Sequence, residues 1–75
     1  MNRIRHYRNA VNATQKDLGE VIGVGQSTID RYESGERKVN VSTAWSIVNA
    51  LNTFNANCSF SDVFPEPQMN SSTNN

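Results

Sequence analysis

The chain has 75 residues, of which 36% are hydrophobic, and its formal net charge is zero. This length excludes more than one domain and leaves a small core, so helical compactness or dimerisation is expected to help it fold. Zero net charge argues against a strongly electrostatic nucleic-acid binder, and the single cysteine, Cys58, excludes an internal disulfide. No apolar run approaches the ~18 residues of a membrane span, so no membrane association is expected.

The first predicted helix spans Asn2–Val11. Ile4, Tyr7 and Val11 recur at positions i, i+3 and i+7, which places them on one apolar stripe. The arginines of this segment lie off the stripe, and Asn12 interrupts the pattern. The segment is therefore expected to bury one face and to expose its basic side chains.

The second predicted helix spans Gln15–Ile22. Thr14 is expected to cap its first turn, and Asp17, three residues further on, can complete a capping box. Gly23 is expected to end the helix, because that position requires a left-handed backbone conformation. The inward side chains of this helix are predicted to be Leu18, Val21 and Ile22.

The third predicted helix spans Gln26–Ser34. Gly25 is a tolerable N-cap, and Gly35 is expected to end the helix. Ile29 and Tyr32 lie at positions i and i+3, so they form its inner face. The sequence ERKVN that follows is predicted to be a connecting loop with a basic pair.

Ser42 is expected to cap a fourth helix that runs to about Leu51, and this helix has the strongest helical period in the chain. Its apolar positions are Ala44, Ile47, Val48 and Leu51. Ser59 is expected to cap a short fifth helix that runs through Phe64 and stops at Pro65. These two segments complete the series of predicted helices.

No segment alternates with a period of two, so the predicted fold is all-α, a compact bundle of about five short helices. Residues 1–64 are predicted to form the folded domain. Residues 65–75 are almost entirely polar, so they bury too little apolar surface to offset the entropy of ordering them. They are predicted to form a disordered C-terminal tail.

Two short helices joined by a glycine turn occupy residues 15–34, with the sequence QKDLGEVIGVGQSTIDRYES. Their apolar positions recur where two crossing helices touch, and Gly19 is small where they cross closest. This segment resembles the helix-turn-helix of the lambda-repressor-like family, which includes phage repressors, Cro proteins and their bacterial XRE relatives. The motifs TQKDL and STIDRYESGER match the family pattern, and the resemblance covers roughly residues 3–64. Gly19 replaces the usual Ala, Gly25 replaces the usual Ser or Thr cap, and the loop at residues 52–58 is longer than usual.

The resemblance implies that the third helix lies in the DNA major groove with its first residues against the bases. Gln26 is the first candidate for base readout, because a carboxamide can form two hydrogen bonds with adenine. Ser27 and Arg31 are further candidates for base contacts, and Thr28 for a phosphate or methyl contact. The alternative for these residues is an ordinary solvated helix face.

The resemblance also implies contacts to the DNA backbone or groove. Helix N-termini favour anions, and basic side chains position a protein on the duplex without reading its sequence. The residues expected to make these contacts are Gln15, Thr28, Arg37, Lys38 and Asn40. Arg8 and Glu33 match a pair that forms an ion pair between the first and third helices of the family.

Trp45 lies off the main apolar stripe of the fourth helix. Aromatic side chains are enriched at protein interfaces, so Trp45 and Phe54 together form a candidate homodimer surface. The alternative is that Trp45 covers the edge of the core.

The function that the resemblance implies is sequence-specific transcriptional regulation, with a Cro-type phage or prophage repressor as the leading interpretation. Such a protein binds a pseudo-palindromic double-stranded DNA operator as a homodimer, formed either beforehand or on the DNA. Two alternatives stay open: the antitoxin of a toxin–antitoxin module, whose protein partner is the toxin, and a controller of restriction–modification genes. A purely protein-binding helical bundle would not explain Gln15, Gln26 and the basic loop together.

The titratable residues argue against an enzyme. One histidine, one cysteine and no clustered carboxylates give no constellation for acid–base or metal chemistry. No cofactor and no metal are therefore expected, and the expected location is the cytoplasm of a bacterial host.

Overall fold

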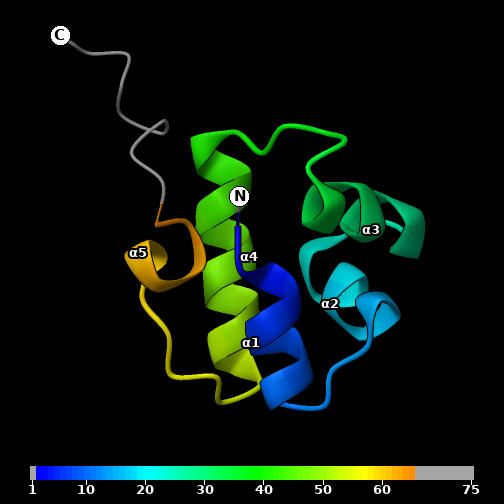
Figure 1. Ribbon diagram of the computed structural model, residues 1–75. Helices are drawn as coiled ribbons and strands as arrows, with labels where there is room; N and C mark the ends of the chain where they lie inside the picture. The colour runs from blue at the N-terminus through cyan, green and yellow to red at the C-terminus, as the bar shows by residue number, and fades with distance from the viewer. Residues whose placement is uncertain (1, 66–75) are drawn as a thin grey trace, which may run out of the picture.

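Helix α4 (Val41–Thr53) is the longest helix of the computed structural model, and the other helices lie around it (Figure 1). The structure describes residues 2–65, and this part of the chain contains five helices and no strand. The other four are α1 (Ile4–Ala10), α2 (Gln15–Ile22), α3 (Gln26–Ser34) and α5 (Phe60–Val63). The predicted all-α fold is confirmed, and the predicted tail beyond Pro65 lies outside the described residues.

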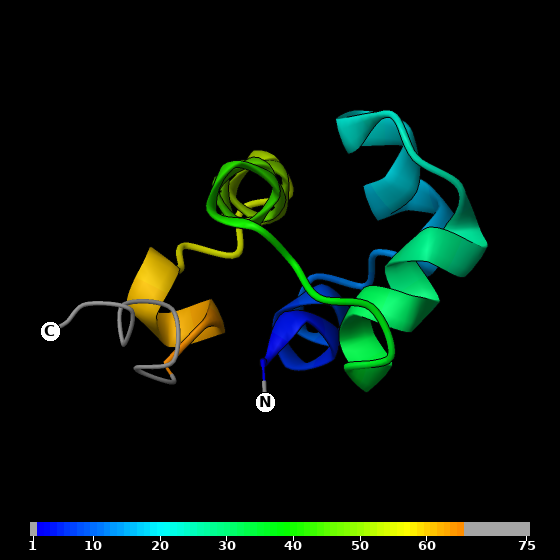
Figure 2. The same cartoon turned by 90° about the horizontal axis from the view of Figure 1, so that it is seen from above.

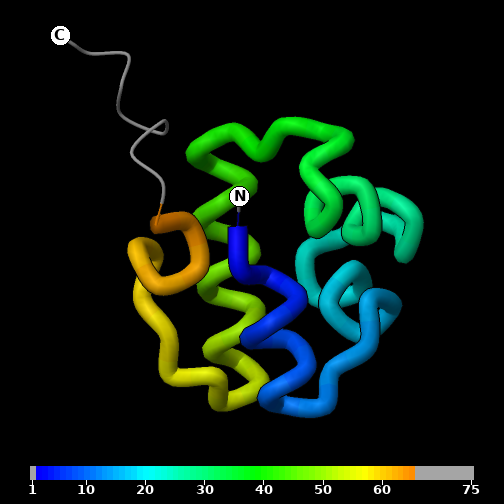
Figure 3. Tube along the Cα trace, viewed as in Figure 1, coloured from blue at the N-terminus to red at the C-terminus, as the bar shows by residue number. Residues whose placement is uncertain are grey.

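The helices form two groups on either side of α4. Seen along the axis of α4, the α2–α3 pair lies on one side and α5 on the other, with α1 between them (Figure 2). The trace shows the connection from α3 arching back to the start of α4 (Figure 3). Helix α3 is therefore at the periphery of the molecule, with α2 and α1 supporting it.

Every helix contributes at least one large side chain to the core. The fully buried ones are Ile4, Leu18, Ile29, Ile47, Leu51 and Val63. Complete burial of such a side chain contributes about 1.5–3 kcal/mol. The predicted stripe of α4 is confirmed, because Ala44 and Val48 are buried with Ile47 and Leu51.

The predicted capping box of α2 is confirmed. The backbone N–H of Asp17 donates to Thr14 Oγ1 at 2.9 Å, and the N–H of Thr14 donates to Asp17 Oδ2 at 2.9 Å. Ser59 and Asp62 form the same motif at the start of α5, so the predicted Ser59 cap is also confirmed. These reciprocal bonds satisfy amide groups that the first turn of a helix leaves without partners.

The predicted N-cap of α4 is wrong, and the helix begins two residues earlier than expected. Asn40 caps the helix instead of Ser42, because its Oδ1 accepts a hydrogen bond from the backbone N–H of Thr43 at 2.8 Å. Asn is as good an N-cap as Ser, so a suitable cap two residues earlier lengthens the helix at its start. The helix also continues to Thr53, beyond the predicted end at Leu51.

The first helix is shorter than predicted, and it spans Ile4–Ala10 instead of Asn2–Val11. The side chain of Asn2 bonds to the folded domain, since its Nδ2 donates to the backbone oxygen of Tyr32 at 2.9 Å. This long-range bond holds the start of the chain outside the helical path, which local periodicity does not show.

Val21 does not point inward as predicted, because 48% of its surface is exposed. The buried residues of α2 are Leu18 and Gly19, and Ile22 is partly buried. Gly19 and Val21 are on nearly opposite faces of a helix with 3.6 residues per turn. Close packing at Gly19 therefore turns Val21 toward solvent.

The longer loop before α5 is closed by one side chain. Asn52 donates from Nδ2 to the Cys58 carbonyl oxygen at 2.8 Å and accepts from the Cys58 N–H at the same distance. Cys58 is a buried free cysteine, and burial raises the pKa of its thiol. The N–H of Arg3 donates to the Val63 carbonyl oxygen at 2.8 Å, so α5 is tied to the start of the chain.

Among residues 2–65, no helix has the length and apolar character that crossing a bilayer requires.

Candidate nucleic-acid interface

The turn between α2 and α3 brings the two helices into close backbone contact. A Cβ atom at Gly19 would lie 2.5 Å from the carbonyl oxygen of Val24, which is far inside van der Waals contact. Gly23 ends α2 with a φ of +83°, and the N–H groups of Gly23 and Val24 both donate to the Gly19 carbonyl oxygen. The missing side chain of Gly19 therefore allows the turn that orients α3.

Helix α3 has a buried face and an exposed face. Ile29, Tyr32 and Glu33 are buried, and Thr28 is partly buried. The exposed side chains include Gln26, Ser27, Asp30 and Arg31. The outer face is therefore almost continuously polar and is backed by a fixed inner face.

Glu33 is a buried carboxylate that joins α1 and the start of α2 to α3. Its side chain is 0% exposed, and Arg8 approaches it with Nε at 2.6 Å from Oε2 and Nη2 at 3.1 Å from Oε1. Arg5 Nε and Gln15 Nε2 donate to the same Oε1 at 3.2 and 3.1 Å. Arg8 also donates to the carbonyl oxygen of Ala13 at 3.0 Å, which fixes the connection between α1 and α2.

The pKa of Glu33 reflects two opposing effects. Burial raises this pKa, but hydrogen bonds from Arg8, Gln15 and Arg5 lower it by more, so the net pKa lies below its ordinary value. The carboxyl group is therefore ionised at neutral pH and acts only as an acceptor.

Gln15 bonds to two carboxylates of α3. Its Nε2 donates to Asp30 Oδ1 at 3.0 Å as well as to Glu33 Oε1. Sequence reasoning named Gln15 but missed Asp30, because an acid on an exposed helix face looks like a solvated side chain. No local pattern links two residues that are 15 positions apart.

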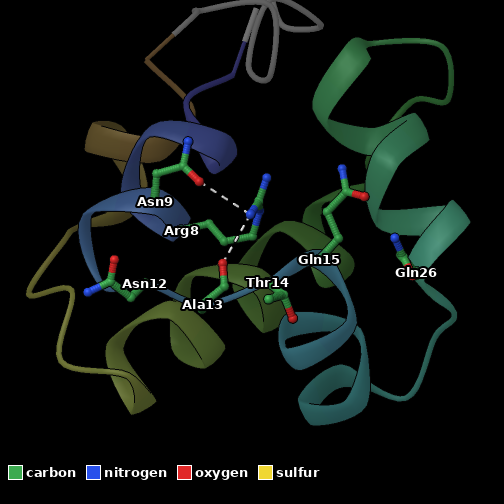
Figure 4. Close-up of a pocket in the computed structure, with 7 residues that line it drawn as sticks. All are labelled: Arg8, Asn9, Asn12, Ala13, Thr14, Gln15 and Gln26. Carbon is green, nitrogen blue, oxygen red and sulfur yellow. Dashed lines mark hydrogen bonds between the residues drawn. The ribbon is translucent and has the colours of Figure 1, made fainter.

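A polar hollow of about 440 Å³ lies where the end of α1 meets the starts of α2 and α3 (Figure 4). Its lining consists of Arg8, Asn9, Asn12, Ala13, Thr14, Gln15 and Gln26. Gln15 is drawn between Arg8 and Gln26, so a predicted backbone contact and a predicted base contact share one hollow. Sequence reasoning missed Asn9 and Asn12; the signal for Asn12 was its place between two helices, where it adopts a φ of +59°.

The basic loop follows α3 directly. Arg37 and Lys38 are exposed, and the N–H of Arg37 donates to the Arg31 carbonyl oxygen at 3.2 Å. Asn40 is exposed, but its side-chain oxygen caps α4. Its Nδ2 group is the part of the side chain that the cap does not use.

Trp45 and Phe54 do not form one continuous surface. Phe54 is the C-cap of α4 and lies nine positions beyond Trp45, which is about 13 Å along the helix axis and about two and a half turns around it. Trp45 instead packs against Phe60, with 4.7 Å between ring centroids, and remains 50% exposed. Val41, one turn earlier, is 53% exposed, so the exposed apolar surface of α4 is formed by Val41 and Trp45.

No cluster of three or more His, Cys, Asp or Glu side chains that could hold a metal ion occurs within residues 2–65.

Comparison with known proteins agrees with this geometry. A family model described as helix-turn-helix matches residues 4–53. The control protein C.SmaI of Serratia marcescens is 40% identical over 50 residues, which are 67% of this chain and 60% of that protein's length. No solved structure matches the chain significantly. The chain therefore belongs to the helix-turn-helix family, in the lambda-repressor-like group that contains the Cro and XRE-type DNA-binding proteins.

Proposed function

We propose that the protein is a sequence-specific transcriptional regulator that inserts α3 into the DNA major groove. The observation that carries this proposal is that α3 has an exposed polar face and an opposite face fixed against the domain. Its exposed face presents Gln26, Ser27 and Arg31, while Ile29 and Glu33 hold its other face against the domain. A fixed helix with a polar outer face is suited to direct readout of bases.

The base contacts are assigned by chemistry and position. Gln26 is the first residue of α3, and its carboxamide can pair with the N6 and N7 atoms of adenine. Arg31 lies one turn beyond Ser27 on the same face and can donate to the O6 and N7 atoms of guanine. Ser27 has a short side chain, so it contacts a base that lies close to the axis of α3.

The backbone contacts surround this face. Arg37 and Lys38 extend from the loop after α3, and their charges contact phosphates. Thr28 and Asn40 add neutral donors on either side, and Gln15 lies at the start of α2, where free amides favour a phosphate. Arg5 and Arg8 are paired with Glu33, so the exposed loop cations carry the electrostatic part of binding.

The protein acts as a homodimer on a pseudo-palindromic site. The exposed surface formed by Val41 and Trp45 on α4 supports this proposal, because large apolar side chains at such exposure favour association. A two-fold symmetric dimer places two α3 helices in successive major grooves, about one helical turn apart.

Among the regulators that the sequence leaves open, a controller of restriction–modification genes has the most support. The similarity to control protein C.SmaI favours it over a Cro-type phage repressor. A controller can activate as well as repress, so a reporter gene behind the bound promoter distinguishes the two. Expression that rises and then falls with protein concentration indicates a controller, and repression at every concentration indicates a Cro-type repressor.

Selection of bound duplexes from a random DNA pool tests the proposal as a whole. Purified protein at near-physiological salt should recover a pseudo-palindromic consensus whose half-sites are about one helical turn apart. Recovery of no sequence above background would contradict the proposal and would direct attention to a protein partner, with the toxin of the antitoxin alternative first.

A further inference from the structure

Both amide hydrogens of Gln15 are already used within the protein. Its Nε2 carries two hydrogens and donates to two carboxylate oxygens, Asp30 Oδ1 at 3.0 Å and Glu33 Oε1 at 3.1 Å. Carboxylates only accept hydrogen bonds, so the side-chain atom facing them has to be the nitrogen. The other terminal atom of Gln15, Oε1, is an acceptor and cannot bond to a phosphate oxygen.

The two carboxylates have different surroundings. Glu33 is buried and also receives hydrogen bonds from Arg5 and Arg8, so it remains satisfied with or without Gln15. Asp30 is exposed on the outer face of α3, one turn beyond Gln26. The bond from Gln15 to Asp30 can therefore be replaced by a bond to another acceptor at the surface. Its loss leaves no buried charge without a partner.

We propose that Asp30 is a positioning residue that restrains Gln15 and thereby limits the affinity of the protein for DNA. This inference rests on the proposed function, in which Gln15 contacts the DNA backbone. Binding then requires an exchange: the N–H of Gln15 leaves Asp30 and donates to a phosphate oxygen. The carboxylate of Asp30 loses its donor and faces the anionic backbone, so it opposes binding in two ways.

The restraint fits the charge balance of the chain. A protein with zero net charge gains little from long-range attraction to DNA, so it depends on each contact that its binding surface makes. An acid that withholds a backbone contact weakens binding at all sequences equally, and only duplexes with good base contacts overcome it. Asp30 therefore lowers the occupancy of weak, non-specific duplexes, while a duplex with good base contacts can still be filled, and it does so without reading a base.

The test is a double-mutant cycle on binding to the selected duplex. Asp30→Ala should tighten binding about tenfold, because Gln15 is freed for the phosphate. The same substitution in a Gln15→Ala background should give only the small gain that comes from removing a charge. Asp30→Asn removes the charge but keeps a side-chain oxygen for Gln15, so its gain should also be small. Glu20→Ala, which removes an exposed acid elsewhere on α2, is the control for net charge.

A second measurement tests, in the absence of DNA, whether Asp30 restrains the side chain of Gln15. Hydrogen exchange of the Gln15 side-chain amide, observed by NMR, should be slow in the parent protein and faster in Asp30→Ala. Exchange that does not change between the two proteins would overturn the restraint directly.

The outcomes separate this inference from the function on which it rests. A gain for Asp30→Ala that persists without Gln15, or that Asp30→Asn equals, would reduce the effect to charge and overturn the inference. Parent protein that binds its duplex while Asp30→Ala is no tighter would also overturn it. If neither protein binds any duplex although the amide exchange differs, the restraint stands as a structural feature, and the proposed function and the role of Asp30 in DNA binding are overturned.

Discussion

Glu33 connects α3 to α1 and to the start of α2. Its carboxylate is fully buried and accepts hydrogen bonds from Arg5, Arg8 and Gln15. The resemblance anticipates the pairing with Arg8, because both residues occur in recognisable motifs. The bonds from Arg5 and Gln15, and the role of Asp30, depend on how α1, α2 and α3 approach one another, so neither motif nor periodicity predicts them.

Removal of the Glu33 carboxylate leaves Arg8 without its main partner in a nearly buried position, since Arg8 is only 11% exposed. Glu33→Ala is therefore expected to lower the free energy of unfolding by about 3–5 kcal/mol, as for other broken buried ion pairs. Urea denaturation followed by circular dichroism measures this loss. Glu36→Ala, an exposed acid in the following loop, should change the free energy of unfolding little, and equal effects for the two variants would contradict the role of Glu33.

The lowered pKa of Glu33 makes stability depend on pH in a defined direction. The ionised carboxylate stabilises the fold above the ordinary pKa of 4.5, and this stability is lost as the pH falls through the lowered pKa. The thermal midpoint of the parent should therefore drop as the pH falls below about 4.5.

Glu33→Gln has no carboxyl group to protonate at this position and should lose less stability over the same acidic range. Its remaining loss comes from Asp17 and Asp62, whose pKa values are lowered first by backbone hydrogen bonds in the capping boxes of Thr14 and Ser59. Parallel pH profiles for the parent and Glu33→Gln would show that Glu33 contributes nothing to acid sensitivity.

At the scale of the helices, local sequence predicts most of what the structure contains. Thr14, Ser59 and Gly23 act within one turn of their own positions, so their capping roles are visible in the sequence. The errors at Asn2, Asn40 and Val21 have other causes, which are a long-range hydrogen bond, a competing cap and the packing at Gly19.

Gly19 tests the contact between α2 and α3. Alanine would improve helix propensity by about 1 kcal/mol, but its Cβ would lie 2.5 Å from the Val24 backbone oxygen. Overpacking of this kind costs about 1–3 kcal/mol or more, so Gly19→Ala is expected to be destabilising on balance. Urea denaturation measures whether Gly19→Ala lowers or raises the free energy of unfolding.

A matched control is available at Gly25, the N-cap of α3. A Cβ there meets nothing within 4 Å, and a serine hydroxyl can cap the helix, so Gly25→Ser should stabilise the domain. If Gly19→Ala were stabilising, α2 would be able to move away from the backbone of Val24 without cost. That result would contradict the role assigned to the close packing at Gly19.

Helix α4 carries the proposed dimer surface. Trp45→Ala should weaken self-association tenfold or more, because a large aromatic side chain is lost from the centre of an interface. Analytical ultracentrifugation measures the change. Val21→Ala removes a comparably exposed apolar side chain from α2 and should leave self-association unchanged. A Trp45→Ala variant that associates like the parent would remove Trp45 from the interface.

At the scale of the whole molecule, the class and order of the helices follow from periodicity and caps, and the family follows from the motifs around Gly19 and Glu33. The arrangement of side chains on the outer surface does not follow from these patterns. The hollow that brings Gln15 beside Gln26, and the bond from Gln15 to Asp30, join segments that are distant in the sequence. These features depend on the packing of α1 and the α2–α3 pair around α4, which single-residue patterns do not encode.

In the proposed function, α3 reads bases while the basic loop holds the DNA backbone. The most direct measurement compares Gln26→Ala and Lys38→Ala on the selected duplex and on a set with every single base-pair change, at several salt concentrations. Gln26→Ala should lose about 1–3 kcal/mol of discrimination at one base pair in each half-site and keep the salt dependence of the parent. Lys38→Ala should weaken binding to all duplexes alike and reduce the salt slope by about one. Gln26→Ala with unchanged discrimination at every position would contradict the claim that α3 is the reading helix.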